Sequence, residues 1–355
     1  MSWKLRRRRL LGDLLKNHHQ ARHKGFTLTE LLVTTAIAGI VVSGLLAVVV
    51  NVLRVDQREV RLSRVQQDTQ RALDYISNDL QEAVYVYPDP SGVRALLNDP
   101  NMPNSAGSTD VLAFWRPTEI PEADIADTVA ACQTDNPTLG ATGCEELLTR
   151  RAEYSLVVYI HAPFDNALVW EGQSRLIRYE LPRYGRSGGA LVERAGYVDP
   201  SSAAATGQVN DFENWAPSAA VDGTDDVLVD YISLPVSTAT VGATAVDCDA
   251  ITGIPATYVP SPPDAAQGTG FFACVRDPDV DNSSLSAVDL RARLAAGATF
   301  RGAQDVFLFV SGDAQPADGN DFTRATLNPA NDLSKLPILS RQTQVRGVVD
   351  RGTSL

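Results

Sequence analysis

Histidine and lysine are nearly missing from residues 26–355 of this 355-residue chain. His161 is the only histidine and Lys335 the only lysine in that stretch. Histidine is the side chain most used for acid–base chemistry near neutral pH, and it is a common zinc ligand. The composition therefore argues against histidine-based catalysis and against a histidine-rich zinc site beyond residue 25.

Basic charge is also scarce outside the first 25 residues. Residues 1–25 carry eight basic side chains and one acidic side chain, a net +7, whereas the whole chain has a formal charge of -12. Removing the +7 from -12 leaves -19 for residues 26–355. Because nucleic-acid backbones are polyanions, an acidic body of this kind disfavours DNA or RNA binding. We expect no nucleic-acid partner.

Charge is almost absent from residues 26–53, where Glu30 is the only ionisable side chain. Residues 31–50 are an uncharged run of twenty. At about 1.5 Å per residue, a helix of this length spans a hydrocarbon layer of ~30 Å. The basic side chains before the run outnumber Arg54 after it, so the positive-inside rule keeps residues 1–25 in the cytoplasm. We predict a transmembrane helix over residues 26–53, with the later residues outside.

Two other interpretations fit this N-terminal region less well. A secretory signal has a shorter apolar stretch that ends in small residues, but no such site precedes Arg54. The four arginines at residues 6–9 are a candidate nucleic-acid patch or localisation signal. Their place before a membrane helix favours a cytoplasmic anchor that sets the orientation.

Glu30 needs an explanation, because a carboxylate inside a membrane is costly unless it has a partner. The residues from Lys24 to Leu32 are K-G-F-T-L-T-E-L-L. This stretch resembles the class III signal of type IV pilins and pseudopilins: a basic leader, a glycine at the cut, a phenylalanine after it and a glutamate fifth in the new chain. The resemblance implies the α+β pilin-like fold, in which a long N-terminal helix packs against a β-rich head.

The resemblance also implies how the N-terminus is processed. A prepilin peptidase would cleave between Gly25 and Phe26 and methylate the new amino group of Phe26. Glu30 would neutralise the N-terminal amine of a neighbouring subunit during assembly, which is physically sensible because a buried carboxylate and a buried ammonium are each expensive alone.

The partners and location follow from the same resemblance. The partners would be prepilin peptidase, other pilins or pseudopilins through the N-terminal helix, and an inner-membrane assembly platform. The protein would cross the bacterial inner membrane once, with its head on the periplasmic side, and then join a periplasmic or extracellular filament.

The apolar helix departs from major pilins in one respect. Major pilins commonly have a proline near the middle of this helix, whereas residues 26–53 contain none. This absence favours a minor pilin or pseudopilin. Gly39, Ser43 and Ala47 form a small-residue stripe, which either packs against neighbouring helices or faces lipid.

Residues 54–87 are predicted to continue the helix as an amphipathic segment. Val65, Ile76 and Leu80 belong to an apolar stripe with three- and four-residue spacing, whereas Asp74 and Asp79 belong to the polar outer face. The prolines at 88 and 90 are expected to end a single helix over residues 26–87. Residues 71–83 also resemble the larger minor pilins and pseudopilins of the J and W types.

Residues 88–355 are predicted to form an extracytoplasmic β-rich head. Aromatic and β-branched residues favour strands over residues 111–115, 153–162, 167–181, 227–232, 270–276, 306–310 and 343–349, with a turn at 163–166. Large heads of this pattern resemble those of cyanobacterial hormogonium polysaccharide secretion pseudopilins. The chain would thus consist of a leader (1–25), a helix (26–87) and a head (88–355).

The four cysteines, Cys132, Cys144, Cys248 and Cys274, all follow the apolar segment. An even number of cysteines in an oxidising compartment favours disulfides, and four free buried thiols are the alternative. Of the three possible connectivities we favour the local pairs, 132 with 144 and 248 with 274.

Two local patterns suggest chemistry but match it incompletely. The segment G-R-S-G-G at 185–189 has the letters of a nucleophile elbow, but no histidine follows it, so a turn is preferred. Asp277, Asp279 and Asp281 alternate like the start of a calcium loop, but Asn282 and Val288 replace its glycine and glutamate. We expect no cofactor and no enzymatic activity, and we keep calcium at these aspartates as a weak candidate.

The function predicted from these features is that of a minor pilin or pseudopilin in a type IV pilus or type II secretion-like filament, supporting motility, adhesion or secretion. The large head favours a tip or priming position. The alternative is an adhesin or ligand-binding head on a pilin stem, for which Trp115, Trp170 and Trp215 are the candidate contact residues unless they belong to the core.

Overall fold

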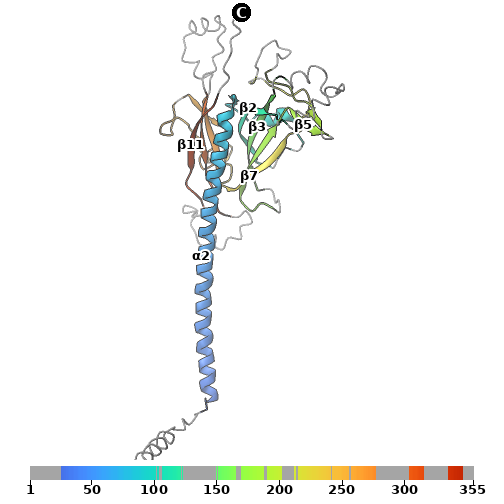
Figure 1. The fold of residues 1–355 in the computed structure, drawn as a ribbon. Helices are drawn as coiled ribbons and strands as arrows, with labels where there is room; N and C mark the ends of the chain where they lie inside the picture. Colours follow the sequence, from blue (N-terminus) through green and yellow to red (C-terminus); the bar gives the residue numbers. More distant parts are fainter. Residues whose placement is uncertain are drawn as a thin grey trace, which may run out of the picture. The chain divides into compact units, whose positions relative to one another are not determined.

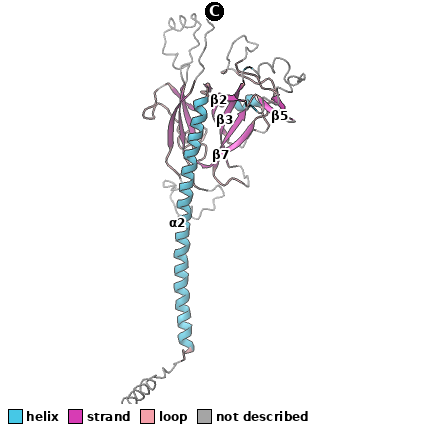
Figure 2. Cartoon of the chain, in the orientation of Figure 1, coloured by secondary structure: helices cyan, strands magenta, loops and turns pink. Residues whose placement is uncertain are grey.

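The computed structural model describes residues 25–100, 102–103, 106–120, 122, 149, 151–164, 169–187, 190–201, 212, 215–240, 242–255, 257–276, 304–315 and 335–346. The chain divides into two compact units, residues 1–58 and 59–355. The predicted α+β class is confirmed, because a long helix is combined with a set of antiparallel sheets (Figures 1 and 2).

The helix α2 (Leu28–Glu82) is the longest element and contains the whole apolar run. Its most apolar 18-residue window has a mean hydropathy of 2.5 and is 0% buried. Three hydroxyls in the run are bonded to the helix backbone: Thr34 Oγ1 donates to Glu30 O at 2.9 Å, Thr35 Oγ1 to Leu31 O at 3.0 Å and Ser43 Oγ to Ile40 O at 2.8 Å. These bonds satisfy the polar groups that would otherwise be costly in lipid.

The helix is shorter than predicted, because α2 begins at Leu28 and ends at Glu82 rather than covering residues 26–87. Residues Tyr85–Val86 form a short strand, β1, that pairs with β2 (Thr109–Glu119). Tyr85 and Val86 face different core clusters, which is the two-residue alternation of a strand. Aromatic and β-branched residues favour that conformation, so the helix stops before the prolines are reached.

The larger sheet has the strand order β1-β2-β3-β4-β7 and is antiparallel throughout. Its remaining strands are β3 (Ala152–Pro163), β4 (Ser174–Leu181) and β7 (Thr224–Ile232). Alternate residues face opposite sides: Leu112 and Phe114 pack with α2, whereas Ala113 and Trp115 join a second, aromatic cluster. Since both faces are covered, the central strands are apolar along nearly their whole length.

The second sheet has the order β11-β10-β9-β8. Its strands are β8 (Tyr258–Ser261), β9 (Phe271–Arg276), β10 (Asp305–Val310) and β11 (Leu339–Gln344). One face contributes Ala273, Val275 and Leu308 to the cluster that also contains Ile76 and Leu80 of α2. The head-side part of α2 is therefore buried by both sheets (Figure 1), and each such large apolar side chain contributes roughly 1.5–3 kcal/mol through burial.

Several predicted strands differ in their limits. The strand predicted over 167–181 begins at Ser174, and the one predicted over 343–349 is β11, displaced toward the N-terminus. The strands β5 (Tyr184–Ser187), β6 (Ala190–Glu193) and β8 and the short helix α3 (Val93–Leu97) were not predicted. They are short and contain glycine, proline or polar residues, so their local pattern is weak. Of the pentapeptide at 185–189, residues 185–187 belong to β5, which pairs with β6, and residues 188–189 lie outside the described residues.

Candidate functional site

The start of α2 brings together the residues that the sequence singled out for processing. Thr27 precedes the first helical residue, and its Oγ1 accepts a hydrogen bond from the Glu30 backbone N–H at 3.3 Å. Glu30 N and Leu31 N also bond to Thr27 O, at 3.0 and 3.1 Å. The threonine acts as a helix N-cap, and the T-x-x-E spacing is that of a capping box. The helix thus begins at Leu28, directly after the Thr27 cap and two residues after the predicted new terminus at Phe26.

Gly25 has space around it. A Cβ added at Gly25 would have nothing within 4 Å, and its φ is outside the left-handed region. Neither the packing nor the backbone of the described residues therefore requires glycine at this position. A requirement for glycine at this position would therefore come from an enzyme that recognises it.

Phe26 and Glu30 are both exposed at this end of the helix. Phe26 is 76% exposed, and Glu30 lies in the first turn of α2. Within the described residues no ion pair to Glu30 is formed. The helix dipole favours a carboxylate near a helix N-terminus. Because no cation among the described residues pairs with Glu30, its carboxylate is available to a cation from another molecule.

The helix surface that follows Glu30 is apolar and uncovered. Residues 25–57 are all exposed, including the small-residue stripe of Gly39, Ser43 and Ala47. A Cβ added at Gly39 would meet nothing within 4 Å. In water such a surface would be unstable, so it requires lipid or other helices around it.

At its other end, α2 carries a buried ionic cluster that the sequence did not predict. Asp79 was expected on the outer polar face, but it is only 8% exposed. Its Oδ2 accepts hydrogen bonds from Tyr159 Oη and from Arg178 Nε, both at 2.7 Å, and its Oδ1 accepts one from Arg116 Nη1 at 3.2 Å. The outer-face prediction is wrong for Asp79 because the sheet covers this side of the helix.

Glu180 completes the ionic cluster. It bonds to Arg116 Nη2 at 3.1 Å and to Arg178 Nη1 at 2.6 Å. Burial opposes ionisation, but the hydrogen bonds and charges of Arg178 and then Arg116 lower the pKa of Glu180. The same carboxylates raise the pKa of Arg178 against the effect of burial. The cluster joins α2 to β2, β3 and β4 through these hydrogen bonds and ion pairs, although Arg116 Nε and Arg178 Nη2 are buried without a hydrogen-bond partner among the described residues.

A signal for this cluster was present in the strand sequence. Leu176, Arg178 and Glu180 alternate along β4 and share one face, and Leu176 belongs to the core. Two charged residues on a core-facing row need buried partners. The partner on α2 was not identifiable, because Asp79 has the same local pattern as an exposed helical residue.

The remaining predicted residues have separate locations. Cys248 and Cys274 form a disulfide, one of the two local pairs expected, and lie in a small cluster with Phe272 and Phe309. Cys132 and Cys144, and the calcium candidates Asp277, Asp279 and Asp281, lie outside the described residues. Among the residues described, no group of three or more potential ligands is placed to hold a metal ion.

His161 is a core residue. It is 0% exposed, and its Nε2 is 2.8 Å from Ser174 Oγ. Burial lowers its pKa to about 3, so the ring is neutral at physiological pH. Two of the candidate contact tryptophans are also buried: Trp115 donates to Tyr87 Oη at 3.0 Å and Trp215 to Val198 O at 2.7 Å. Trp170 is half-buried.

Comparison with known proteins identifies one motif. Residues 20–46 match the family model described as the prokaryotic N-terminal methylation motif. No curated protein and no solved structure gives a significant match. The motif indicates a type IV pilin-like precursor, a structural subunit that is processed by prepilin peptidase and assembles with other pilins. Together with the long apolar helix, it indicates membrane anchoring.

Proposed function

We propose that the chain is the precursor of a minor pilin or pseudopilin, which is cleaved after Gly25 and incorporated into a type IV pilus or type II secretion-like filament. The observation that carries the proposal is the methylation motif at residues 20–46, at the start of an apolar helix whose surface is uncovered. The motif supplies the processing site, and the helix supplies the surface for assembly.

Cleavage adds water across the Gly25–Phe26 peptide bond. The leader leaves with a new carboxyl group on Gly25, and Phe26 gains a free amine, which is then methylated. The amine keeps its positive charge when it carries one methyl group. Once in an apolar environment it needs a negative partner, and Glu30 of an adjacent subunit provides one at the start of α2.

The filament core would bury the exposed helix surface. Gly39, Ser43 and Ala47 would let neighbouring helices approach closely, and the Ser43 hydroxyl is already bonded within its own helix. The absence of a proline from residues 26–53 supports a minor pilin or pseudopilin. The large head supports a tip or priming position, because bulky heads pack poorly in a uniform shaft.

The proposed location is the inner membrane, followed by the filament. Eight basic side chains in residues 1–25 would remain in the cytoplasm, and the head would face the periplasm. The disulfide between Cys248 and Cys274 supports an oxidising compartment for the head. Within the pilin-like proteins, the resemblance of residues 71–83 supports a subunit of the larger J- and W-type class.

Substitutions at Gly25 and Glu30 test the two steps separately. Gly25→Ala leaves the fold unchanged and is expected to block removal of the leader, as seen by a larger mass of the membrane-extracted protein. Gly92→Ala is the matched control, because a Cβ at Gly92 also meets nothing within 4 Å. Normal processing of Gly25→Ala would contradict the assigned cleavage site.

Glu30→Gln is expected to be processed normally but to be lost from sheared filament fractions. Glu59→Gln provides a control with the same change at an exposed position later in α2. If Glu30→Gln enters filaments as well as Glu59→Gln does, the proposed pairing of Glu30 with a neighbour's amine is wrong.

A further inference from the structure

Exposed apolar side chains gather at one end of the head unit, which comprises residues 59–355. Among the described residues of this unit, the exposed large apolar side chains are those at positions 60, 75, 96, 169, 234 and 338. Val169, Leu234 and Ile338 come from three separate segments and are 76%, 44% and 56% exposed. Hydrogen bonds within the unit bring these three segments together.

Leu234 lies at the end of the head where α2 enters it. Arg61 is two residues after the start of the unit, and its Nη1 donates to Ala314 O at 3.5 Å. Ser233 N donates to Ser311 O at 3.0 Å, three residues before Ala314. Because Leu234 directly follows Ser233, its exposed side chain lies beside the segment that contacts the first turn of α2 in this unit.

Ile338 lies at the same end. Leu336 N donates to Gly312 O at 2.9 Å, and Leu336 O accepts from Ser311 Oγ at 3.0 Å. Ile338 follows two residues later, and the exposed Lys335 precedes Leu336. A lysine can lie along an apolar surface while its ammonium group stays in water or among polar headgroups.

Val169 belongs to a third segment at this end. Asp313 N donates to Tyr231 O at 2.7 Å, and Tyr231 Oη donates to Glu171 Oε2 at 3.0 Å, two residues after Val169. Trp170 and Tyr231 are both half-buried, and such rings with a polar group are typical of membrane–water interfaces. These segments form the base of the head, which consists of residues 169–171, 231–234, 311–314 and 335–338.

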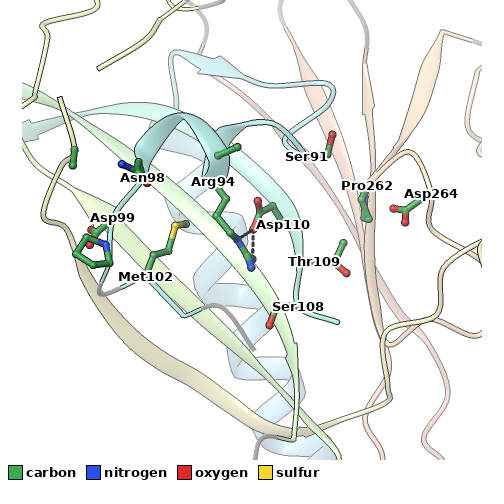
Figure 3. Close-up of a pocket in the computed structure, with 13 residues that line it drawn as sticks. Ser91, Arg94, Asn98, Asp99, Met102, Ser108, Thr109, Asp110, Pro262 and Asp264 are labelled. Carbon is green, nitrogen blue, oxygen red and sulfur yellow. Dashed lines mark hydrogen bonds and ion pairs between the residues drawn. The ribbon is translucent and has the colours of Figure 1, made fainter. Parts of the chain in front are cut away.

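The hollow beside α3 has a different character (Figure 3). Arg94 forms an ion pair with Asp110 there. Asp264, which also belongs to the lining, accepts a hydrogen bond from Ser237 Oγ at 2.8 Å. Charged groups with polar partners are costly to transfer into lipid. The hollow therefore does not favour contact with lipid, whereas the base does.

The length of the chain between the two units indicates what covers the base. Glu59, the first residue of the head unit, is six residues after Leu53, where the predicted transmembrane segment ends. Six residues rise about 9 Å as a helix, and even fully extended they reach only about 20 Å. The end of the head that contacts Arg61 is thus held close to the bilayer. A neighbouring chain would have to displace lipid that is already present.

The charges at and beside the base suit zwitterionic headgroups. Arg64 and Lys335 are exposed and can pair with lipid phosphates. Glu59 and Glu171 are also exposed and can pair with the ammonium groups of choline or ethanolamine headgroups. Because both signs are present, we expect no requirement for anionic lipid.

We propose that the base of the head docks on the membrane surface, with Val169, Leu234 and Ile338 inserted between lipid headgroups. The proposal rests on the membrane anchoring in the proposed function, but not on cleavage or on filament assembly. Docking would hold the head against the bilayer until the subunit enters a filament. A Gly25→Ala chain that retains its leader is expected to dock equally well.

Quenching of tryptophan fluorescence by brominated lipid measures the contact. The full-length chain is reconstituted in phosphatidylcholine vesicles with or without bromine on the acyl chains, and the signal of the parent chain is subtracted. Ile338→Trp places a reporter at the base, just before β11. Gln344→Trp is the matched control, because Gln344 is exposed and pairs with Asp305 at the other end of β11.

We expect the added fluorescence of Ile338→Trp to be strongly quenched and that of Gln344→Trp to be unchanged. Equal quenching of the two reporters, or none in either, would overturn the proposal. A blue shift of the Ile338→Trp emission without quenching would overturn it as well, because protein rather than lipid would then cover the base. Flotation of the chain with the vesicles checks the membrane anchoring itself, and a chain that does not float contradicts the anchoring as well as the docking.

A charged substitution tests whether the contact is apolar. Leu234→Glu, introduced beside the Ile338→Trp reporter, is expected to remove most of the quenching, because a carboxylate opposes insertion into lipid. Leu96→Glu is the control, since Leu96 is also exposed but lies on α3 outside the base. Unchanged quenching in the Leu234→Glu chain would show that Leu234 does not enter the membrane and would contradict the proposed docking surface.

Discussion

At the scale of single residues, buried charge determines how the stem helix is joined to the head. Asp79 bonds to three side chains from β2, β3 and β4. Removing one member of a buried ionic cluster leaves the others desolvated and unpaired, which typically costs about 3–5 kcal/mol. An exposed pair on the same helix contributes much less, since solvent screens it.

Asp79→Asn is therefore expected to lower the free energy of unfolding by about 3 kcal/mol. Asp74→Asn is the control, because the Asp74 side chain is 62% exposed in its ion pair with Arg341, and its loss should cost less than about 1 kcal/mol. Urea unfolding of the full-length chain followed by tryptophan fluorescence measures both. Equal losses in the two variants would show that burial of Asp79 does not determine its contribution.

Glu153 is expected to make stability depend on pH. Burial raises its pKa from 4.5 to about 7. Between these values the folded chain holds a proton that the unfolded chain has lost, so stability falls as the pH rises from about 4.5 to about 7. The contribution is complete below that window and is lost above it, for a change of roughly 3 kcal/mol.

Glu153→Gln removes this titration. The difference in unfolding free energy between the variant and the parent chain should therefore change across the same pH window, with the variant gaining relative stability at the alkaline end. Unfolding curves at pH values on both sides of the window provide the measurement. A difference that is constant with pH would contradict the raised pKa of Glu153.

Glu30 and Asp79 show what could be predicted at the residue scale. Glu30 was identifiable because a charge inside an apolar run has no local explanation. Asp79 was not, because its burial comes from strands that are distant in the sequence. Local pattern distinguishes an isolated charge in an apolar segment, but it does not distinguish an exposed helical aspartate from one that a sheet will cover.

At the scale of elements, predictions succeeded where the periodic signal was long. Residues 153–162 were predicted as a strand and form most of β3 (Ala152–Pro163), and the apolar run lies entirely within α2. The end of α2 was misplaced because Tyr85–Val86 pairs with β2, a contact that the local sequence does not encode. The short strands β5, β6 and β8 similarly depend on partners rather than on their own pattern.

The disulfide between Cys248 and Cys274 links the segment before β8 to β9 across a sequence separation of 26. Closing a loop of this size stabilises the folded state by about 3 kcal/mol in the chain-entropy model. Cys248→Ser is expected to lose about this amount in unfolding measurements and to become less sensitive to reductant. Loss of less than about 0.5 kcal/mol would show that the surrounding aromatic cluster holds the segment without the bond.

At the scale of the whole molecule, the two compact units need different surroundings. Residues 25–57 expose an apolar helix, whereas residues 59–355 carry a formal charge of -19, because residues 26–58 have two acidic and two basic side chains and are neutral overall. The apolar helix needs lipid or other helices, and the acidic head needs water. In a membrane the helix would lie in lipid, and in a filament it would lie among other helices. The head would be in water in both locations.

The small-residue stripe tests this view of assembly. Gly39→Leu adds bulk where nothing lies within 4 Å in the same chain, so the monomer should insert in membranes normally. It is expected to be reduced in sheared filament fractions, because the helices can no longer approach closely. Val41→Leu, on the opposite side of the helix and 54% exposed, is expected to assemble normally. Equal incorporation of both variants would assign the stripe to lipid.

The most direct test of the central claim is the N-terminus of the protein in the cells that make it. Mass spectrometry of the membrane-extracted chain should find Phe26 as the first residue, carrying one added methyl group on its amine, with residues 1–25 absent. A chain that retains its arginine-rich leader ahead of Phe26 would contradict the account.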